Sequence, residues 1–280
     1  MEKKWTTTIE PKHKLFELKL NEVWNYRDLI LLFVQRDFKT KYKQTVLGPL
    51  WFIIQPLFTT IIYTFVFGNL AGLSTDGLPQ FLFYMAGNVP WLYFSTCLTN
   101  TSNTFTGNAA VFGKVYFPRL TTPIATVITS MINYFIQFAM FLIFEVYYLC
   151  TGANVHINWY ALLTPILVIQ IALLGMGFGI IISSLTTKYR DLQVLVSFGV
   201  SLWMYATPIV YAASSLSPKA YAILMLNPIA PIIELMRYGW LGAGKVSFLY
   251  WGISWITTIV VVLWGIVMFN RVEKTFMDTV

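Results

Sequence analysis

Six long runs of the chain contain no aspartate, glutamate, lysine or arginine. The runs cover residues 44–75, 77–113, 120–144, 146–187, 192–218 and 246–270. Each run can hold a helix of about 20 residues, which at about 1.5 Å per residue crosses a hydrocarbon core of roughly 30 Å. The pattern therefore predicts an all-α polytopic membrane protein. We expect six transmembrane helices, at about 47–67, 81–104, 122–149, 160–185, 192–211 and 248–269.

An amphipathic pattern precedes the first expected span, at residues 24–43. Its apolar residues recur every four positions and are Tyr26, Ile30, Val34, Phe38 and Tyr42. Polar residues gather on the opposite side, which predicts an N-terminal interface helix lying along the cytoplasmic membrane surface. Asp37 and Lys41 interrupt the apolar side, so a solvated basic linker is the alternative. We expect residues 1–23 to form a separate cytoplasmic extension.

The segment 212–246, between the fifth and sixth expected spans, is too apolar for a water-exposed loop and too interrupted to cross the membrane. Irregular backbone at membrane depth is tolerated only where protein or a water-filled cavity satisfies it. We therefore expect short re-entrant outer gate helices that border a pathway. Glu234 and Arg237 lie three positions apart and can pair on one helix face, in either a structural or a gating role.

The composition excludes a water-soluble enzyme. Hydrophobic residues make up 57% of the 280 residues and charged residues only 11%, against about 25% in soluble domains. Of the 19 lysines and arginines, all but Lys219, Arg237 and Lys245 fall in the N-terminal segment, the loops 105–121 and 186–191, and the tail. The positive-inside rule then places both termini in the cytoplasm. The net charge of +7 is thus a topology signal, and we expect no nucleic-acid partner.

A few isolated residues carry weaker signals. Cys97 and Cys150 lie in apolar spans without a CxxC spacing, which favours buried thiols over a disulfide or a metal pair. The first 22 residues are polar, so we expect no cleavable signal peptide. Glu145 lies within a turn of the outer end of the third span, and we expect it to snorkel to the membrane interface.

The loop between the second and third spans contains a short apolar helix candidate at 107–119, which Pro118 ends. Such a helix suits docking into a groove of a soluble partner, and a plain interhelical loop is the alternative. Two glycine-lysine segments, 239–245 and 107–114, fail the phosphate-loop pattern because valine follows the lysine in both. If ATP drives this protein, another polypeptide binds it.

Aromatic residues are dense within the expected spans. Examples are Trp51, Phe58, Tyr63, Trp91, Tyr93, Trp203 and Tyr205. Aromatic faces stack on the C–H faces of sugar rings, and aromatics with a polar tip also form belts at the membrane interface. We expect most of these residues to serve in packing or in the belt.

Five segments, taken in order, carry a family resemblance. They are 36–51 with its Leu47-Gly48-Pro49-Leu50-Trp51, the loop 108–119, Lys188-Tyr189-Arg190-Asp191, Asn227-Pro228 and Glu273-Lys274-Thr275-Phe276-Met277-Asp278. In this combination the chain resembles the ABC-2 type permease subunits that export polysaccharides, above all those for O-antigen, capsule and teichoic acid. The resemblance covers residues 24–280, which would form one ABC-2 type transmembrane domain.

The resemblance implies a transport subunit in a bacterial inner membrane, not an enzyme. Two copies would form a homodimer and bind two copies of a cytoplasmic ABC ATPase, which would carry the ATP and magnesium. The exporter would move a lipid-linked polysaccharide through a channel at the homodimer interface.

The resemblance also implies roles for particular residues. The helix that couples to the ATPase would present Asn108, Val111, Phe112, Lys114, Val115, Tyr116 and Phe117. The outer gate would contain Asn227, Pro228, Pro231, Glu234 and Arg237. The first and fifth spans would line the channel with Trp51, Phe58, Tyr63, Trp203 and Tyr205. Candidates for holding the pyrophosphate of the lipid carrier are Arg36, Lys39, Lys41 and Lys43, because basic residues near the membrane surface attract anionic head groups. Simple positive-inside anchoring explains the same basic residues.

Three other functions are alternatives. An ABC-2 permease that exports a drug or a lipid would share these motifs. A polytopic membrane transferase would need a catalytic constellation, yet the only histidines are His13 and His156 and the loops lack clustered acidic residues. A secondary transporter or channel would be expected to show more intramembrane ionisable groups or an internal repeat. We expect no cofactor and no metal in the chain itself.

Overall fold

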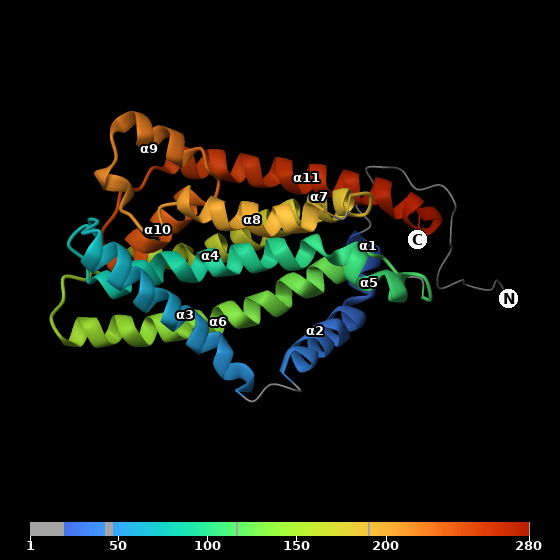
Figure 1. The fold of residues 1–280 in the computed structure, drawn as a ribbon, viewed down its shortest axis with the longest axis horizontal. Coiled ribbons are helices and arrows are strands. Elements are labelled where there is room, and N and C mark those ends of the chain that lie inside the picture. Colours follow the sequence, from blue (N-terminus) through green and yellow to red (C-terminus); the bar gives the residue numbers. More distant parts are fainter. Residues whose placement is uncertain (1–19, 43–46, 116, 190, 280) are drawn as a thin grey trace.

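The computed structural model describes residues 20–42, 47–115, 117–189 and 191–279. This part of the chain consists of helices and their connections and contains no strand (Figure 1). The α-helices are α1 (Leu20–Asn25), α2 (Arg27–Tyr42), α3 (Trp51–Tyr63), α4 (Gln80–Ser102), α5 (Thr104–Phe112), α6 (Thr121–Cys150), α7 (Thr164–Thr186), α8 (Leu192–Tyr205), α9 (Pro218–Met225), α10 (Ala230–Leu241) and α11 (Phe248–Thr279). The shorter elements are the 3-10 turns η1 (Gly48–Leu50), η3 (Trp159–Leu163) and η4 (Ala213–Ser215), and the π-helical η2 (Thr64–Leu70).

Four helical stretches of the described chain are long and apolar enough to cross a membrane. They are Gly48–Leu70, Thr121–Cys150, Trp159–Thr186 and Phe248–Val272. These stretches coincide with the first, third, fourth and sixth predicted spans, so the prediction of a multi-pass helical membrane protein is confirmed. The helices α9 and α10 are bent by 105° at a short break, and would add a fifth span if the pair is counted as one.

The second and fifth predicted spans differ from these four. Helix α4 has 23 residues, the length of a span, but it carries polar residues such as Asn88 and Asn100 and is buried by its neighbours instead. Helix α8 has only 14 residues, or about 21 Å, and ends at Tyr205 instead of the predicted residue 211. Pro208 accounts for the early end, because proline disfavours helix in the residue before it and has no N–H to continue the ladder.

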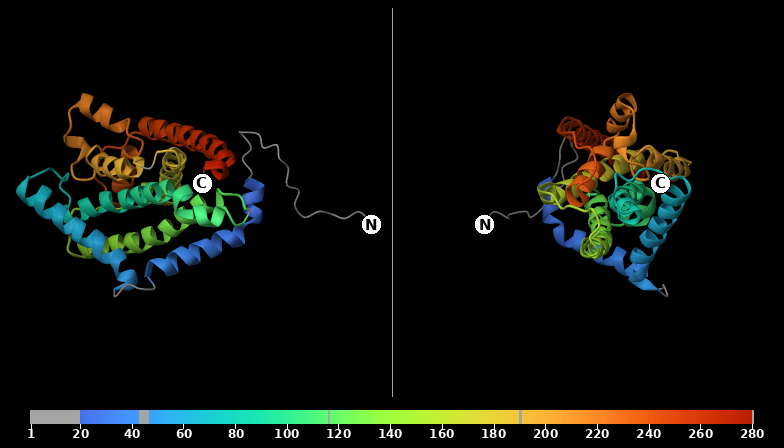
Figure 2. Two further views of the ribbon diagram at one scale, coloured as in Figure 1. Left: turned by 45° about the vertical axis from the view of Figure 1, so that its right-hand side comes forward. Right: turned by 90° about the vertical axis from the view of Figure 1, so that its left-hand side faces the viewer.

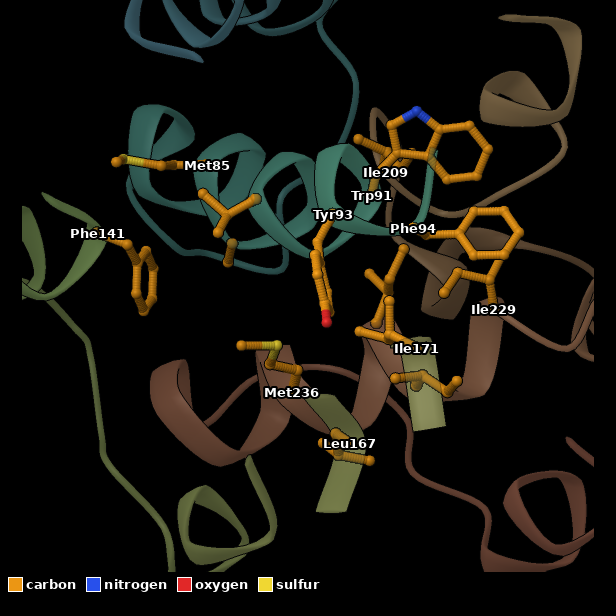
Figure 3. Close-up of a cluster of buried hydrophobic side chains, with 14 of the residues drawn as sticks. Met85, Trp91, Tyr93, Phe94, Phe141, Leu167, Ile171, Ile209, Ile229 and Met236 are labelled. Carbon is orange, nitrogen blue, oxygen red and sulfur yellow. The ribbon is translucent and has the colours of Figure 1, made fainter. Parts of the chain in front are cut away.

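Helix α4 lies at the centre of the bundle, where α3, α6, α7 and α10 cover it (Figure 2). Glycines of α7 allow a close crossing with α4. A Cβ atom at Gly175 would lie 2.7 Å from the Cβ of Cys97, and one at Gly179 would lie 2.5 Å from the Cβ of Thr101. Small residues at such crossings are typical of helix packing in membranes. On another side of α4, Tyr93 points towards α10 in the buried core (Figure 3).

The two ends of the bundle are built from different segments. The helices α1 and α5, the connection between α7 and α8, and the C-terminal part of α11 lie at one end, whereas α9 and α10 lie at the other (Figure 1). The first end carries Lys114, Arg119, Lys188 and Arg271, and we name it the basic end; the other is the outer end. The positive-inside rule associates such a basic end with the cytoplasm.

The predicted interface helix is two helices, α1 and α2, that meet at Tyr26. Its apolar side is covered by protein, because Ile30 and Val34 are buried against α6 and a neighbouring aromatic cluster. A second apolar strip with Trp24 and Leu31 is exposed. The structure therefore corrects the prediction: the regular apolar ridge packs on the bundle, and a different strip remains available to lipid.

Glu145 also departs from the prediction. Its side chain is 1% exposed, and its Oε1 atom has no hydrogen-bond partner among the described residues. It lies one turn beyond the buried Phe141, on the face of α6 that packs on the bundle. Because this face points inward, Glu145 does not snorkel. Both cysteines are free thiols, with Cys97 buried and Cys150 exposed.

Candidate functional site

Asn227 ties the outer helices to the end of α8. It lies in the tight turn between α9 and α10. Its Nδ2 atom donates to the carbonyl oxygen of Ala206 at 2.8 Å and to the hydroxyl of Thr207 at 2.9 Å. Its Oδ1 atom accepts from the indole Nε1 of Trp203 at 3.0 Å. One side chain thus satisfies backbone and side-chain groups where α8 ends.

A chain of buried hydrogen bonds holds the next residue, Pro228. The carbonyl oxygen of Pro228 accepts from the hydroxyl of Ser254 on α11, and Ser254 accepts from Nε2 of Gln170 on α7 at 2.9 Å. Gln170 accepts in turn from the indole of Trp251 at 2.9 Å. The turn at Asn227 and Pro228 is therefore fixed to α7, α8 and α11.

Glu234 and Arg237 form a fully buried ion pair on α10. Their side chains are 2% and 0% exposed, and Nη1 of Arg237 donates to Oε1 of Glu234 at 2.7 Å. Nη2 of Arg237 donates to the carbonyl oxygen of Pro208 at 2.7 Å, and the guanidinium lies over the ring of Phe83 at 3.9 Å from its centroid. The predicted pairing is confirmed. It joins α10 to α4 and to the connection that follows α8. The neighbouring Pro231, in the first turn of α10, is buried.

Helix α8 has a side that faces away from its own subunit. None of its residues is buried, and Ser197, Ser201 and Tyr205 are exposed at a spacing of four. The hydroxyls of Ser197 and Ser201 donate to carbonyl oxygens one turn earlier in the same helix, at 3.3 Å and 2.9 Å. These bonds use the serine donors, but the lone pairs of the serine oxygens and the phenol of Tyr205 leave a polar strip, which suits water or another polypeptide better than lipid.

The end of helix α3 meets the end of α8. The hydroxyl of Tyr63 donates to Sδ of Met204 at 3.0 Å, which joins the two helices. Trp51 and Phe58 are exposed on α3, as Tyr205 is on α8. Three of the five predicted channel aromatics are therefore accessible from outside the subunit.

Trp203 faces the interior of the subunit instead. Its ring packs edge-on against Phe94 of α4 and Phe178 of α7, with ring centroids 5.2 Å apart in both pairs. Its indole N–H is already used by Asn227. Trp203 therefore anchors α8 to the bundle, which differs from the predicted position on a channel surface.

A helix overlaps the segment predicted to couple to the ATPase, 108–117, but its bounds differ. The structure has α5 at Thr104–Phe112, so the helix starts earlier and ends earlier. Phe112 and Phe117 are buried and pack against each other, with ring centroids 5.7 Å apart. Phe117 also packs on Phe33 of α2, with ring centroids 5.6 Å apart. The remaining predicted residues differ in exposure: Lys114 and Val115 are exposed, Asn108 and Val111 are half-buried, and Tyr116 lies outside the described residues. A partner at this surface can reach Lys114 and Val115 but not the two phenylalanines.

Two hydrogen bonds connect α5 to the bundle. Nε2 of Gln193, in the first turn of α8, donates to the hydroxyl of Thr106 at 3.0 Å. The backbone N–H of Phe105 donates to the hydroxyl of Ser183 on α7 at 3.2 Å. The ring of Phe105 stacks on that of Phe269 of α11, with ring centroids 4.5 Å apart. A displacement of α5 would therefore act directly on α7, α8 and α11.

The predicted basic patch on α2 is described in part. Nη2 of Arg36 lies 2.8 Å from Oδ1 of Asp37, and the guanidinium lies over the ring of Phe33, 4.7 Å from its centroid. Lys39 is exposed on the same helix. Lys43 and the side chain of Lys41 lie outside the described residues. Among the described members of the patch, Lys39 presents its charge outward, whereas Arg36 already has a partner.

Most of the helices described above lie in a region that matches a known protein family. The ABC-2 type transporter family matches residues 28–241, from α2 to the end of α10. The chain belongs to the ABC-2 type transporter family. The matched region contains α5, α8 and the turn at Asn227.

Related transporters cover nearly the whole of this ABC-2 chain. It is 30% identical over 252 residues to the O-antigen export system permease protein RfbA of Klebsiella pneumoniae, which covers 90% of the chain and 94% of the relative. The protein of the same name from Myxococcus xanthus is 28% identical over 217 residues, covering 78% and 80%. The polysialic acid transport protein KpsM of Escherichia coli is 21% identical over 249 residues, covering 87% and 93%. The resemblance to polysaccharide-export permeases predicted from the sequence is therefore confirmed.

The sequence prediction missed three polar residues on α8 of this ABC-2 chain. They are Gln193, Ser197 and Ser201. Isolated serines are common at helix crossings in membranes, so their presence in an apolar span did not indicate a polar surface. The signal was their spacing, because with Tyr205 they repeat every four residues along the whole helix.

Proposed function

We propose that this chain is the permease subunit of an ATP-driven exporter that moves a lipid-linked polysaccharide outward across a bacterial inner membrane. The observation that carries the proposal is the exposed row of Ser197, Ser201 and Tyr205 on α8. A second copy presenting the same row across a two-fold axis would enclose a polar path. The O-antigen and polysialic acid permeases among the relatives support a polysaccharide as the cargo.

In this proposal α3 and α8 of two copies form the channel of a homodimer. Aromatic side chains such as Phe58 and Tyr205 would offer faces for the C–H surfaces of sugar rings, and the serines would offer hydrogen bonds to hydroxyl groups. Neither group is charged, so the path would contact a passing glycan through stacking and hydrogen bonds and not through ion pairs.

Energy would come from two copies of a separate ABC ATPase that bind ATP and magnesium. The ATPase would dock at the basic end, which would lie in the cytoplasm together with both termini. Closure of the ATPase would push on α5. The bond from Gln193 to Thr106 would pass the displacement to α8, and the bond from Trp203 to Asn227 would pass it to the outer helices. The helix between these two contacts can thus couple the basic end to the outer end.

Lys39 is the candidate for receiving the pyrophosphate of the lipid carrier. A basic residue near the surface attracts an anionic head group by about 1 kcal/mol. Lys39→Glu replaces this attraction with a similar repulsion, so we expect the affinity for the lipid-linked substrate to fall about thirty-fold, since about 1.4 kcal/mol is tenfold. The measurement is the substrate concentration that half-saturates ATPase stimulation in proteoliposomes.

Lys219→Glu is the matched control for this substitution, because Lys219 is an exposed lysine at the outer end. We expect its half-saturating concentration to equal that of the wild type. An unchanged value for Lys39→Glu would assign the patch to anchoring alone.

Depletion of the chain in its own host tests the proposed cargo. We expect a surface polysaccharide to disappear and its lipid-linked precursor to accumulate inside the cell. Wild-type protein should reverse both effects only when its ATPase is present. Unchanged surface polysaccharide together with a new sensitivity to a drug would identify the chain as a drug or lipid exporter instead.

A further inference from the structure

A polar cavity lies between α3, α4 and α6. Its volume is about 230 Å³, room for several waters at about 30 Å³ each. The polar residues that line it are Gln55, Thr96, Ser130, Asn133 and Gln137. Its position is separate from the contact between α3 and α8 at Tyr63, which lies two turns beyond Gln55 on α3.

The cavity lies at membrane depth, towards the basic end. Thr96 is six residues before the end of α4 at Ser102, or about 9 Å along the helix axis. Asn133 is 12 residues after the start of α6 at Thr121, or about 18 Å. At this depth a polar lining without a ligand or water would be costly, because lipid supplies no hydrogen bonds.

The lining has a particular chemistry. The described residues around the cavity include amides, hydroxyls and aromatic rings but no charged side chain. Asn133 is 8% exposed, and its Oδ1 atom has no hydrogen-bond partner in the described part of the chain. A buried acceptor of this kind costs about 1–3 kcal/mol until a donor reaches it. Trp51, exposed at the start of α3, adds an aromatic face.

We propose that this cavity binds one sugar ring of the exported glycan; the inference rests on the proposed function. Sugar hydroxyls both donate and accept, so they match amide and hydroxyl side chains, and the C–H face of the ring would pack on Trp51. The pyrophosphate of the carrier is excluded because no described lining residue is positively charged. The isoprenoid chain is excluded because it would leave Asn133 and Gln137 without partners.

The first experiment removes the amides. Asn133→Leu and Gln137→Leu replace each amide with an apolar side chain of similar size, and Thr126→Val is the control. Thr126 lies on the same helix outside the cavity, and its hydroxyl bonds only within α6, to Thr122. The probe is the host's own lipid-linked glycan, extracted from its membranes, added to the permease and ATPase in proteoliposomes.

We expect the glycan concentration that half-saturates ATPase stimulation to rise at least ten-fold in each leucine variant and to stay unchanged in Thr126→Val. Copurification of the ATPase with each of the three variants shows that the complex is folded and assembled. Wild-type half-saturation in both leucine variants would overturn the proposal. Failure of the proposed function is a different result, since the wild type itself would then show no stimulation by the glycan and no export.

The second experiment measures occupancy directly. Gln55→Cys is introduced together with Cys150→Ser, and its labelling by a methanethiosulfonate reagent is timed; Cys150→Ser alone gives the background from the buried Cys97. We expect the extracted glycan lipid to slow labelling at least five-fold, and the carrier lipid freed of glycan by mild acid to have no effect. Equal protection by both would identify a lipid site, and no protection by either would identify a water-filled cavity. Both results would overturn the proposal.

Discussion

The buried pair of Glu234 and Arg237 is the residue-scale feature with the largest energetic consequence. Both charges are removed from solvent, which is costly, and the cost is recovered only while the pair and its hydrogen bonds are complete. Arg237 also holds the carbonyl oxygen of Pro208 and lies over Phe83. If Arg237 is removed, Glu234 keeps an unpaired buried charge and the end of α8 loses its contact with α10.

We expect Arg237→Met to destabilise the protein by about 3–5 kcal/mol, because breaking one half of a buried pair leaves the other charge uncompensated. The double variant Glu234→Met with Arg237→Met removes both charges and should recover most of that loss. The measurement is thermal unfolding of the purified chain in detergent, compared among Glu234→Met alone, Arg237→Met alone and the double variant. A double variant as unstable as the sum of the two single ones would show that the pair itself contributes little.

At the scale of elements, α5 and the connection that follows it together present a buried side and an exposed side. Phe112 and Phe117 hold it to α2, and Lys114 and Val115 follow it on the exposed surface of the basic end. Only the exposed side can meet a soluble partner. The two sides therefore predict different defects when they are changed.

We expect Val115→Asp to reduce copurification of the ATPase at least ten-fold while the permease remains as stable as the wild type. Phe112→Ala should instead destabilise the permease by about 3–5 kcal/mol, since it leaves a cavity in the aromatic cluster. Ile223→Asp is the control, because Ile223 is an apolar residue at the outer end that is at least as exposed as Val115. Normal ATPase recovery with Val115→Asp would remove this surface from the proposed interface.

Helix positions were predictable from sequence to the extent that apolar runs and prolines fix them. The third span is predicted at 122–149 and lies at Thr121–Cys150. The side of a helix that meets a neighbour was not predictable in the same way. Trp203 and Tyr205 are two residues apart in one apolar run, yet one anchors α8 to the bundle and the other faces outward. Hydropathy reports that a helix is apolar, but orientation depends on partners such as Asn227 that are distant in sequence.

The assembly is a property of the whole molecule. If two copies meet along α8, a cysteine at Ser201 lies near its equivalent in the second copy. We expect Ser201→Cys, with Cys150→Ser, to give a covalent dimer with a flexible bismaleimide in membranes. Ser184→Cys is the matched control, because Ser184 is buried within the subunit on α7 and should give none. Dimers formed instead by Ile143→Cys, on the exposed side of α6, would place the interface elsewhere.

Across the whole molecule, hydrogen bonds at the two ends of α8 link it to α5 and to the outer helices, and one bond at each end can be removed separately. Gln193→Leu breaks the bond to Thr106 of α5, and Trp203→Phe breaks the bond to Asn227 while keeping an aromatic ring. Each loss costs about 1 kcal/mol, too little to unfold the protein. We therefore expect ATP hydrolysis to continue near the wild-type rate while the glycan exported per ATP falls several-fold in both variants. Thr257→Val removes a hydroxyl whose bond lies within α11 and should keep the wild-type ratio. If export and hydrolysis fell in equal proportion in both α8 variants, these contacts would support the assembly without transmitting the motion.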